Sequence, residues 1–466
     1  MFIGREEELQ ILENRYNSSK FEFGYLYGQR RIGKTSLLDE FSKNKKSLIL
    51  FASDSDDTTI RRDFSYSLSK LTKNSGITYQ SWDSFFEAVS AYFGNENGIM
   101  VIDEYPNIVL TRDGKRKRTD FVSKLQNAID RVFSHQKFLL VLTGSNISFM
   151  EKEVKDSNAP LYQRNTFQLM LTKLDWNSAL KMLNDMDIKD KLRVLCLTDT
   201  FPFYLSNIDV GLSFMENIEK LFFSKDALFV NDPSKIFTSE METSGLYSGI
   251  MKNIASGNNT VSSLAESLNL ETSVISVYLD KLIDNNIVSK HYMFNSKRNT
   301  YYKIIDRATA FYFRFIFSNA ELIKLGYGKS IMMENNNKID DFIHHAFEDL
   351  CITYLKNLSR NMKLGSLFVD FSNYRIENSP LGRSVEIDIV SEANNKLLIG
   401  ECKLSKNKKG LDVLNKMKEN TSIPPFSSYK DIDYYIFSES GFDDLLLKEE
   451  SDHVHLINEE RMLCVK

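Results

Sequence analysis

The sequence has little cysteine, little proline and no long apolar run, and each shortage excludes a class of protein. The four cysteines, Cys196, Cys351, Cys402 and Cys464, lie far apart and form no C-x-x-C pair, which argues against a disulfide framework or a zinc ribbon. Only seven prolines interrupt the 466 residues, as in chains of helices and sheets rather than disordered tracts. The most apolar stretches are too short to span a bilayer, and the amino terminus is charged from Arg5 onward, unlike a secretory signal. We therefore expect a cytoplasmic globular protein that makes no membrane contact.

The chain also lacks a strong net charge and a convincing histidine cluster. Its formal charge is −4, so any binding to nucleic acid has to come from local patches. Neither His344-His345 nor His453-x-His455 has a ligand partner at helical or finger spacing, so we do not expect a histidine-based metal site. The length exceeds what one hydrophobic core usually supports, which indicates about two to four domains.

Against these absences stands a specific motif near the amino terminus. It fits the phosphate-binding pattern G-x-x-x-x-G-K-[ST] at each fixed position, and the predicted nucleotide contacts are Gly28, Gln29, Arg30, Arg31, Ile32, Gly33, Lys34, Thr35 and Ser36. The glycines let backbone N–H groups turn toward phosphates, while Lys34 supplies positive charge and Thr35 a hydroxyl for Mg²⁺. A short apolar run precedes the motif and a helical pattern follows it. A chance glycine-rich turn lacks that context, so the motif predicts an ATP-binding P-loop, or Walker A element.

A second element of the same kind lies downstream. Residues 98–104 form an apolar run that ends in Asp103 and Glu104, as expected of a buried parallel strand that delivers carboxylates to its carboxyl end. A buried strand with a solvated acidic end is the plainer interpretation. Paired with the phosphate loop, the run instead predicts a Walker B element. Asp103 would then hold Mg²⁺, and Glu104 would activate the water that attacks the γ-phosphate.

Three further residues are candidates for contact with the γ-phosphate. A third apolar strand, residues 138–143, is followed by Ser145 and Asn146, which are sensor candidates, although such residues also favour ordinary turns. Arg164 could serve as an arginine finger, either within the chain or across a subunit interface. A solvated surface arginine is an equally good interpretation of Arg164.

These motifs resemble the AAA-type ATPases, specifically a bacterial and archaeal group that opens with a Phe-x-Gly-Arg-Glu box. Phe2, Gly4, Arg5 and Glu6 match that opening, and Asp103-Glu104 matches its Walker B ending. The resemblance implies that Phe2, Gly4 and Arg5 line the adenine pocket. It is specific for ATP binding but not for a biological task.

The middle of the chain has the pattern of a winged helix-turn-helix. Residues 246–305 indicate three helices and two alternating strands, with a polar, basic hairpin tip at residues 295–299. Such a module often binds DNA, and Lys290, Lys297, Arg298 and Lys303 support phosphate contacts by the wing. Asp280 and Asp284 on the third helix oppose DNA binding, so a protein-interaction role stays open. A basic run at residues 112–118 is a second candidate for phosphate contact, although a solvated loop is the commoner meaning.

A predicted hairpin near the carboxyl terminus carries the remaining chemistry. Because side chains alternate along strands, Asp388 on the first strand can converge with Glu401 and Lys403 on the second. This D…E-x-K arrangement resembles restriction-endonuclease-like nucleases, in which two acids coordinate Mg²⁺ and the lysine assists the attack on phosphate. The resemblance implies that Glu348, on a preceding amphipathic helix, supplies a further acid to a second Mg²⁺ or Mn²⁺ site. An ordinary cross-strand ion pair is the alternative.

Over almost its whole length the chain resembles the archaeal-type ATPase family, whose carboxyl-terminal domain is usually described as uncharacterised. The expected fold class is an α/β P-loop NTPase domain with a parallel sheet flanked by helices, a winged helix-turn-helix, and an α/β restriction-endonuclease-like domain. We place these at residues 1–170, 244–310 and 311–466, with a helical lid or linker at 171–243. The resemblance implies ATP-site roles for Gly33, Lys34, Thr35, Asp103 and Glu104.

The leading hypothesis is a Mg·ATP-dependent ATPase switch coupled to DNA binding and to a metal-dependent nuclease domain. One rival is a regulatory or signalling switch whose third domain binds nucleic acid or protein without cutting it. Another is tight ATP binding with scarcely any hydrolysis. The sequence leaves open the activity of the nuclease-like centre, the nucleic-acid target, a protein or homo-oligomeric partner, and the cellular process.

Overall fold

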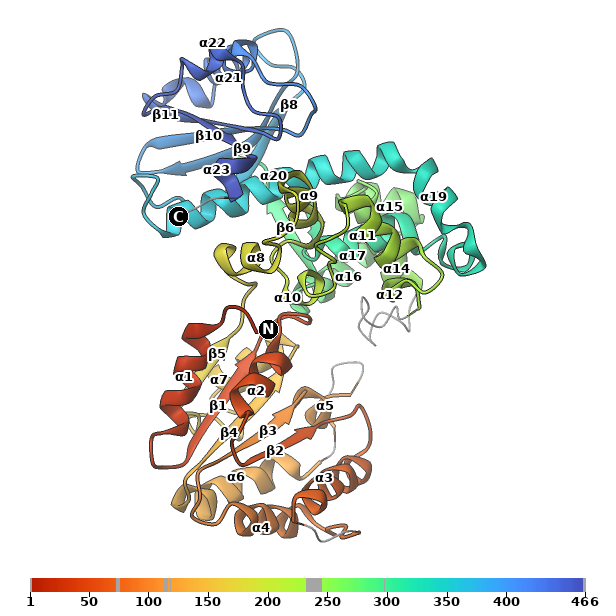
Figure 1. Cartoon of the computed structure of the whole chain (residues 1–466), viewed down its shortest axis with the longest axis vertical. Coiled ribbons are helices and arrows are strands. Elements are labelled where there is room, and N and C mark those ends of the chain that lie inside the picture. Colours follow the sequence, from red (N-terminus) through yellow and green to blue (C-terminus); the bar gives the residue numbers. More distant parts are fainter. Residues whose placement is uncertain are drawn as a thin grey trace. The chain divides into compact units, whose positions relative to one another are not determined.

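A computed structural model of the chain describes residues 2–72, 76–111, 116–117, 119–231, 245–296 and 298–463. The chain divides into two compact units (Figure 1). The first comprises Met1–Ser178 with residues 201–203 and 284–286, and the second comprises Ala179–Thr200, Tyr204–Ile283 and Ile287–Lys466. The predicted division into four domains stays a prediction, although its first boundary lies close to the end of the first unit's main segment. No helix in the described ranges has the length and apolar character needed to cross a bilayer.

A five-stranded parallel sheet forms the centre of the first unit, as predicted. The strand order is β2-β3-β4-β1-β5, and each neighbouring pair is parallel. The strands are β1 (Glu22–Tyr27), β2 (Ser47–Phe51), β3 (Gly98–Asp103), β4 (Phe138–Gly144) and β5 (Phe167–Met170). Strands β1, β3 and β4 are buried along their whole length, which explains their continuous apolar sequences. Because all strands run in parallel, the predicted Walker A and Walker B residues meet at the carboxyl edge of the sheet.

Helices flank this sheet, which confirms the P-loop NTPase fold class. They are α1 (Glu6–Tyr16), α2 (Lys34–Ser42), α3 (Asp57–Thr72), α4 (Trp82–Phe93), α5 (Pro106–Val109), α6 (Phe121–Arg131), α7 (Ile147–Lys155) and the first turn of α8 (Trp176–Met182). The core between α3, α4 and α6 is aromatic: the Trp82 ring lies 4.7 Å from Phe121 and 5.8 Å from Phe64, centroid to centroid. The high phenylalanine content therefore serves packing in this layer.

The predicted three helices and hairpin are present in the second unit. They are α14 (Gly245–Ala255), α15 (Val261–Leu268), α16 (Thr272–Asp284), β6 (Val288–Tyr292) and β7 (Thr300–Ile304), and β6 pairs antiparallel with β7. Thr260 and Ser263 form a reciprocal capping box at the start of α15. Asp280 and Asp284 are exposed on α16, so the acidic outer face predicted for this helix is real.

The hairpin packs against the carboxyl-terminal part of the same unit, which the sequence did not indicate. The Phe294 N–H donates to the Asn373 carbonyl oxygen at 2.8 Å, and the Phe294 ring stacks on Phe426 with centroids 5.6 Å apart. Lys303 does not point to solvent: its Nζ lies 2.7 Å from the Asp349 carboxylate. Lys303 is therefore a poor phosphate contact, and Lys297 lies outside the described residues.

The basic run at residues 112–118 is described only at Arg116 and Lys117. Arg116 pairs with the buried Glu153 carboxylate at 2.7 Å. The Lys117 ammonium donates to the carbonyl oxygens of Ser55 and Asn107, at 2.9 and 2.8 Å. These two side chains bind other groups of the first unit. They therefore give less support to a DNA contact by this run.

A second five-stranded sheet, mixed in direction, forms the carboxyl-terminal α/β part. Its order is β12-β11-β10-β9-β8, with β8, β9 and β10 antiparallel and β10, β11 and β12 parallel. The strands are β8 (Ser372–Ile376), β9 (Val385–Ala393), β10 (Lys396–Lys403), β11 (Asp431–Ser438) and β12 (Val454–Asn458). The predicted hairpin turn has Asn394 and Asn395 at φ 53° and 63°, as a tight two-residue turn requires.

The remaining helices lie in the second unit. Those before the hairpin are α9 (Ile188–Thr198), α10 (Pro202–Leu205, whose first two residues belong to the first unit), α11 (Phe214–Ile218), η2 (Glu219–Phe223) and α12 (Leu228–Asn231). Those after it are α17 (Arg307–Phe311), η4 (Tyr312–Ile316), α18 (Ala320–Leu322), η5 (Ile323–Tyr327), α19 (Gly328–Glu334), α20 (Asn336–Arg360), α21 (Leu411–Thr421), α22 (Asp444–Leu447) and α23 (Glu459–Leu463). The long helix α20 contacts β9 and β10, and α21 contacts β9 and β11. A buried apolar cluster that includes Val385, Ile387 and Leu414 forms the core between α21 and the sheet.

Candidate functional site

The phosphate loop connects β1 to α2 and needs glycine at both fixed positions. Gly33 has φ 89°, a conformation that residues with a Cβ rarely adopt. At Gly28 a Cβ would lie 2.5 Å from the Leu171 carbonyl oxygen, so a side chain would displace the neighbouring backbone. The loop therefore takes its shape from these two residues, and α2 begins directly after it at Lys34.

Lys34 is buried, and its side chain binds the inner side of the loop. Its Nζ donates to the carbonyl oxygens of Gly28 and Gln29, at 2.9 and 3.1 Å. Burial lowers the pKa of Lys34, and the carboxylates of Glu104 and Asp103 oppose that shift. An ammonium held by neutral carbonyl oxygens in a buried place favours a stronger anionic partner, such as a nucleotide phosphate.

Thr35 and Asp103 provide oxygen ligands suited to Mg²⁺. The Thr35 hydroxyl donates to the Asp103 carboxylate at 3.1 Å, although the two residues are far apart in sequence. Thr143, at the end of β4, donates a short hydrogen bond to the other Asp103 oxygen and orients the carboxylate. Hydroxyl and carboxylate oxygens are the ligands that Mg²⁺ prefers, so these residues fit a Mg·ATP complex. Thr143 was missed in the sequence, because a threonine at a strand end carries no signal of its own.

Glu104 is held in place by its backbone and by β4. It has φ 54°, and its N–H donates to Asp103 Oδ1 at 3.1 Å. Its Oε2 accepts hydrogen bonds from the Ser145 hydroxyl at 2.9 Å and from the Ser145 N–H at 3.3 Å. Strained backbone of this kind clusters at functional sites. Ser145 was predicted to sense the γ-phosphate, and its contact in the structure is with the predicted catalytic carboxylate.

Two other predicted residues at this site have structural partners. The Asn146 side chain accepts from the Phe149 N–H at 3.0 Å and caps α7. Arg164 makes two hydrogen bonds of 2.8 Å to Asp130. Arg164 lies three residues before the start of β5, so it lies at the amino edge of the parallel sheet, opposite the phosphate loop. This placement argues against a contact with the chain's own γ-phosphate, and a role toward a second copy stays a prediction.

The amino-terminal segment touches the phosphate loop through Arg5. Its guanidinium donates to the carbonyl oxygens of Ile32 and Thr172, at 3.0 and 2.6 Å, and pairs with Glu8. Gly4 has φ 75°, and a Cβ there would lie 2.7 Å from the Ser178 hydroxyl. Arg5 is therefore bound to backbone, and an adenine contact by Phe2, Gly4 or Arg5 stays a prediction. Thr35 and Ser36 are exposed at the start of α2, on the side where phosphates are expected.

The second candidate centre lies on β9, β10 and α20. The register that pairs Gly400 with Ile389 places Glu401 opposite Asp388, one step further along the two strands. Between β8 and β9 the register shifts, because Ser372 pairs with Val390 whereas Tyr374 pairs with Ile387. An extra residue thus bulges from β9 beside Asp388. Bulges re-aim side chains next to active sites, and this one leaves Asp388 off the apolar face of Val385, Ile387 and Val390.

Acidic groups and a lysine converge at this place as predicted. The Cys402 N–H donates to Asp388 Oδ2 at 2.8 Å, and Lys403 Nζ lies 2.5 Å from Glu401 Oε1. Burial, followed by the nearby carboxylates of Glu401 and Glu348, raises the pKa of Asp388 to about 7. The Glu348 carboxylate also accepts a contact from His345 Nδ1 at 3.3 Å. Three carboxylates around one ammonium leave a deficit of positive charge, which is the electrostatic condition for a divalent cation.

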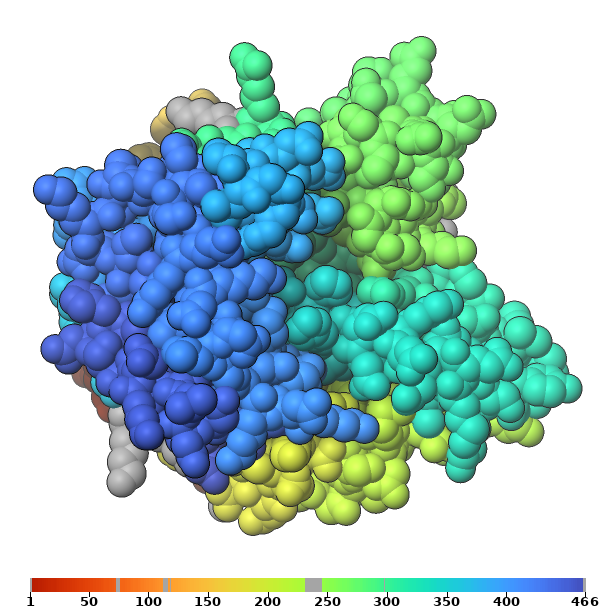
Figure 2. Space-filling view, turned by 90° about the horizontal axis from the view of Figure 1, so that it is seen from above, coloured from red at the N-terminus to blue at the C-terminus, as the bar shows by residue number. Residues whose placement is uncertain are grey.

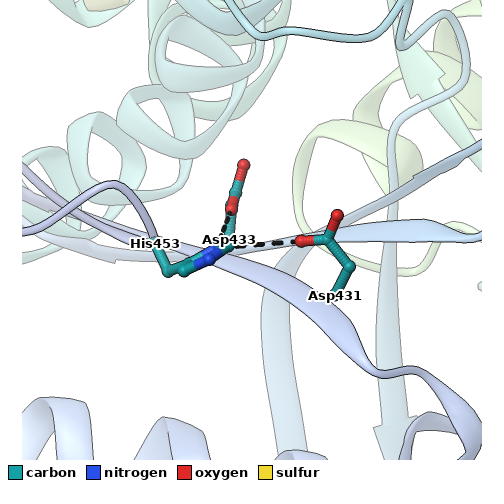
Figure 3. Close-up of side chains that lie close together, drawn as sticks. All are labelled: Asp431, Asp433 and His453. Atoms are coloured by element: carbon teal, nitrogen blue, oxygen red, sulfur yellow. Dashed lines mark hydrogen bonds and ion pairs between the residues drawn. The ribbon is translucent and has the colours of Figure 1, made fainter.

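The carboxylate oxygens of Glu348, Asp388 and Glu401 do not all lie within 4.8 Å of one another. Within the described ranges, the cluster that brings three acidic or histidine ligand atoms within 4.8 Å of one another consists of Asp431, Asp433 and His453 (Figure 3). The sequence did not predict this cluster, because parallel pairing of β11 with β12 brings His453 to the aspartates. Lys396 Nζ already lies 2.8 Å from Asp433 and 3.7 Å from Asp431. We therefore interpret it as an ion-pair network.

The raised pKa of Asp388 predicts pH-dependent metal binding. Because the folded pKa of about 7 lies above the ordinary value of 3.8 for an aspartate, the folded protein holds a proton that a metal ion must displace. Mn²⁺ affinity, measured by electron paramagnetic resonance, should rise about tenfold per pH unit up to about pH 7 and then level off. By the same linkage, the stability of metal-free protein falls as pH rises through this window. A flat affinity profile, or the same profile in Asp388→Asn, would contradict the assignment.

Two parts of the chain match known protein families. Residues 2–207 match the model of an ATPase domain predominantly from Archaea, and residues 312–417 match a family of archaeal and bacterial proteins of unknown function. An uncharacterized protein of Methanocaldococcus jannaschii is 27% identical over 399 residues, which is 85% of each chain. An uncharacterized ATP-binding protein of the same organism is 50% identical over 46 residues, covering 10% of this chain and 78% of that one.

Two solved structures that are similar to this chain have low sequence identity and TM-scores below 0.5. A Walker-type ATPase of Pyrococcus abyssi has a TM-score of 0.49 and 19% identity, over 67% of this chain and 96% of that chain. The ORC2 protein of Aeropyrum pernix has a TM-score of 0.42 and 13% identity, over 72% and 92%.

Proposed function

Because residues 2–207 match an ATPase domain predominantly from Archaea, we propose that this chain is an ATP-driven switch that controls a metal-dependent nuclease centre. ATP hydrolysis takes place in the first unit. The nuclease centre comprises Glu348, Asp388, Glu401 and Lys403 in the second unit. DNA is the proposed substrate.

The proposed ATPase activity rests on the contacts that position Glu104 and the residues around it. Thr35 and Asp103 would hold Mg²⁺, which when bound with ATP neutralises charge on the β- and γ-phosphates. Lys34 would exchange its carbonyl partners for phosphate oxygens. Glu104, oriented by Ser145, would then take a proton from the attacking water.

The observation that carries the nuclease half is the uncompensated charge around Asp388. Its pKa is raised first by burial and then by the nearby Glu401 and Glu348 carboxylates. Lys403 keeps its proton: burial lowers its pKa, but Glu401 and Asp388 outweigh that effect and raise it. A cation bound by the three acids would lower the pKa of a bound water and offset charge on a phosphate. Lys403 would orient the scissile phosphate beside them.

The test is cleavage of linear, circular and single-stranded DNA by the full chain with Mg²⁺ or Mn²⁺, with and without ATP. Asp388→Ala should reduce the rate of cleavage by at least about a hundredfold, because the central acid is lost. Asp444→Asn serves as the matched control, since Asp444 is an exposed acid of the same unit. ATP should change the rate of the wild type but not that of Lys34→Ala.

Three results would overturn all or part of this proposal. No cleavage of any substrate under any condition would remove the nuclease assignment. Equal cleavage by Asp388→Ala would show that the activity belongs to a contaminant or to another site. If the rate of cleavage is the same with and without ATP, the nuclease assignment stands and the proposed ATP switch is wrong.

A second function is favoured by one specific observation, namely that Glu348, Asp388 and Glu401 do not bring three ligand oxygens within 4.8 Å of one another. In that reading the carboxyl-terminal part binds nucleic acid or a protein without cutting it, and ATP regulates the binding. DNA binding with intact product after long incubation with Mn²⁺ would favour this function over the first.

A further inference from the structure

A cavity of about 910 Å³ opens in the second unit beside Glu348. Its walls come from the first two helices of the three-helix segment, the β6–β7 hairpin, α20, and strands β8 and β9. Figure 2 shows a hollow in the surface where the green, teal and blue segments that contain these elements meet. The volume is near the upper end of about 300–1,000 Å³ for small-ligand sites, so the cavity accommodates more than one nucleotide-sized group.

Three guanidinium groups from three different elements line this cavity: Arg298 from the hairpin, Arg314 from η4 and Arg375 from β8. None of them lies within 4.0 Å of a carboxylate oxygen of any described residue. Two other positively charged side chains in the wall already form ion pairs: Lys303 with Asp349, and Arg307 with Asp199. The Arg314 guanidinium lies over the rings of Phe315 and Phe342, at 5.5 and 5.9 Å from their centroids, which holds it in place.

The cavity is continuous with the proposed nuclease centre. Glu348 belongs to both, and Glu386, which also lines the cavity, lies two residues before Asp388 on β9. Aromatic side chains complete the wall, among them Tyr301, Tyr302 and Phe342. Unpaired arginines together with aromatic walls are the combination that binds single-stranded nucleic acid, because a single strand offers both phosphates and unpaired base faces.

We propose that this cavity binds a single-stranded segment of nucleic acid and presents one of its phosphodiesters to Glu348 and Asp388. Arg298, Arg314 and Arg375 contact successive phosphates, and the bases enter between the aromatic side chains. The inference rests on the proposed function, which it deepens by naming single strands as the substrate class. Asp280 and Asp284 make the exposed face of α16 acidic, which disfavours the binding of a duplex by this helix.

The experiment is fluorescence anisotropy of labelled oligonucleotides of about 12 residues with the full chain in EDTA, which prevents cleavage. Single-stranded DNA, the matching duplex and a mononucleotide competitor are compared. Arg298→Gln/Arg375→Gln should weaken single-strand binding about tenfold or more. It should also reduce the slope of log affinity against log salt by about 1.4, that is about 0.7 for each lost phosphate contact. Both arginines are exposed, so the fold should tolerate the change.

The matched control is Lys329→Gln/Lys338→Gln, which removes two exposed positive charges of the same unit outside the cavity. It should leave affinity and salt slope unchanged. Equal losses in the control, tighter binding of the duplex than of the single strand, or full competition by the mononucleotide would each overturn the proposal.

The outcome is independent of cleavage. If no DNA is cut in the presence of metal but Arg298→Gln/Arg375→Gln still weakens single-strand binding, the inference stands and the nuclease function fails. If DNA is cut normally and that variant binds and cuts single strands like the wild type, the cavity assignment fails and the nuclease function stands.

Discussion

Glu104→Gln should reduce ATP turnover by about a hundredfold to ten-thousandfold and leave ATP bound, because the amide cannot accept the proton of the attacking water. The structure supports this role, since Ser145 contacts the Glu104 carboxylate and fixes its direction. Phosphate release measures turnover, and a fluorescent ATP analogue measures binding in the same preparation. Lys34→Ala should instead lose binding, since the ammonium is the buried cation of the loop.

The control for Glu104→Gln is Glu87→Gln, which removes an exposed carboxylate of the same unit on α4. It should turn over ATP at the wild-type rate. The turnover rate of Ser145→Ala should lie between those of Glu104→Gln and Glu87→Gln, because this change removes a hydrogen bond to the Glu104 carboxylate but keeps the carboxylate. Turnover by Glu104→Gln within twofold of the wild type would mean that another group is the base. Negligible turnover by the wild type itself would favour tight ATP binding over hydrolysis.

Arg307→Met should destabilise the second unit by about 3–5 kcal/mol, because it removes the positively charged partner of a buried carboxylate. The Arg307 guanidinium is buried and pairs with Asp199 at 3.2 Å. It also donates to the carbonyl oxygens of Cys196 on α9 and Ala346 on α20, at 3.1 and 3.3 Å. One side chain thus joins three helices of the unit that carries the nuclease centre.

The two tryptophans make this prediction measurable in the full chain. Trp82 and Trp176 both lie in the first unit, so tryptophan fluorescence during urea unfolding reports that unit. Circular dichroism reports both units, because helices occur throughout. Arg307→Met should move the circular-dichroism transition to lower urea while the fluorescence transition stays in place.

Two further variants separate the ion pair from general disruption. Asp199→Asn combined with Arg307→Met should cost less than the sum of the single changes, since the partners interact directly. Arg383→Met breaks a more exposed pair with Glu419 and should cost less than about 1 kcal/mol. A cost below about 1 kcal/mol for Arg307→Met would contradict the prediction, and so would a parallel shift of the fluorescence transition.

Much of the nucleotide site was predictable because its parts are local or follow from parallel strands. The conformation of the phosphate loop depends on Gly28 and Gly33, which a short motif specifies. Asp103 reaches Thr35 because β1 and β3 end at the same edge, as two buried apolar runs in a parallel sheet must. The hairpin of β9 and β10 was also predictable, since alternation along each strand places Asp388 and Glu401 on one face.

Other predicted roles have less support, because the side chains concerned have structural partners that the sequence did not indicate. Lys303 was expected to face nucleic acid, but it pairs with Asp349, a residue 46 positions away. Phe294 at the end of the hairpin packs on Phe426, so the hairpin is part of the core of its unit. Arg164 and Asn146 have ordinary structural partners. Charge and helix-capping chemistry identify such residues as polar, but long-range packing decides which neighbour they meet.

By itself the sequence determined the presence of the phosphate loop, the parallel sheet, the three helices with their hairpin, and the β9–β10 hairpin of the second sheet. Periodicity, glycine conformation and strand burial are properties of short segments, so they can be read from the order of residues. Only the tertiary structure decided that Ser145 holds Glu104, that β9 bulges beside Asp388, and that unpaired arginines surround a cavity next to Glu348. Those relations join residues that are distant in sequence, and the packing of whole elements sets their distances.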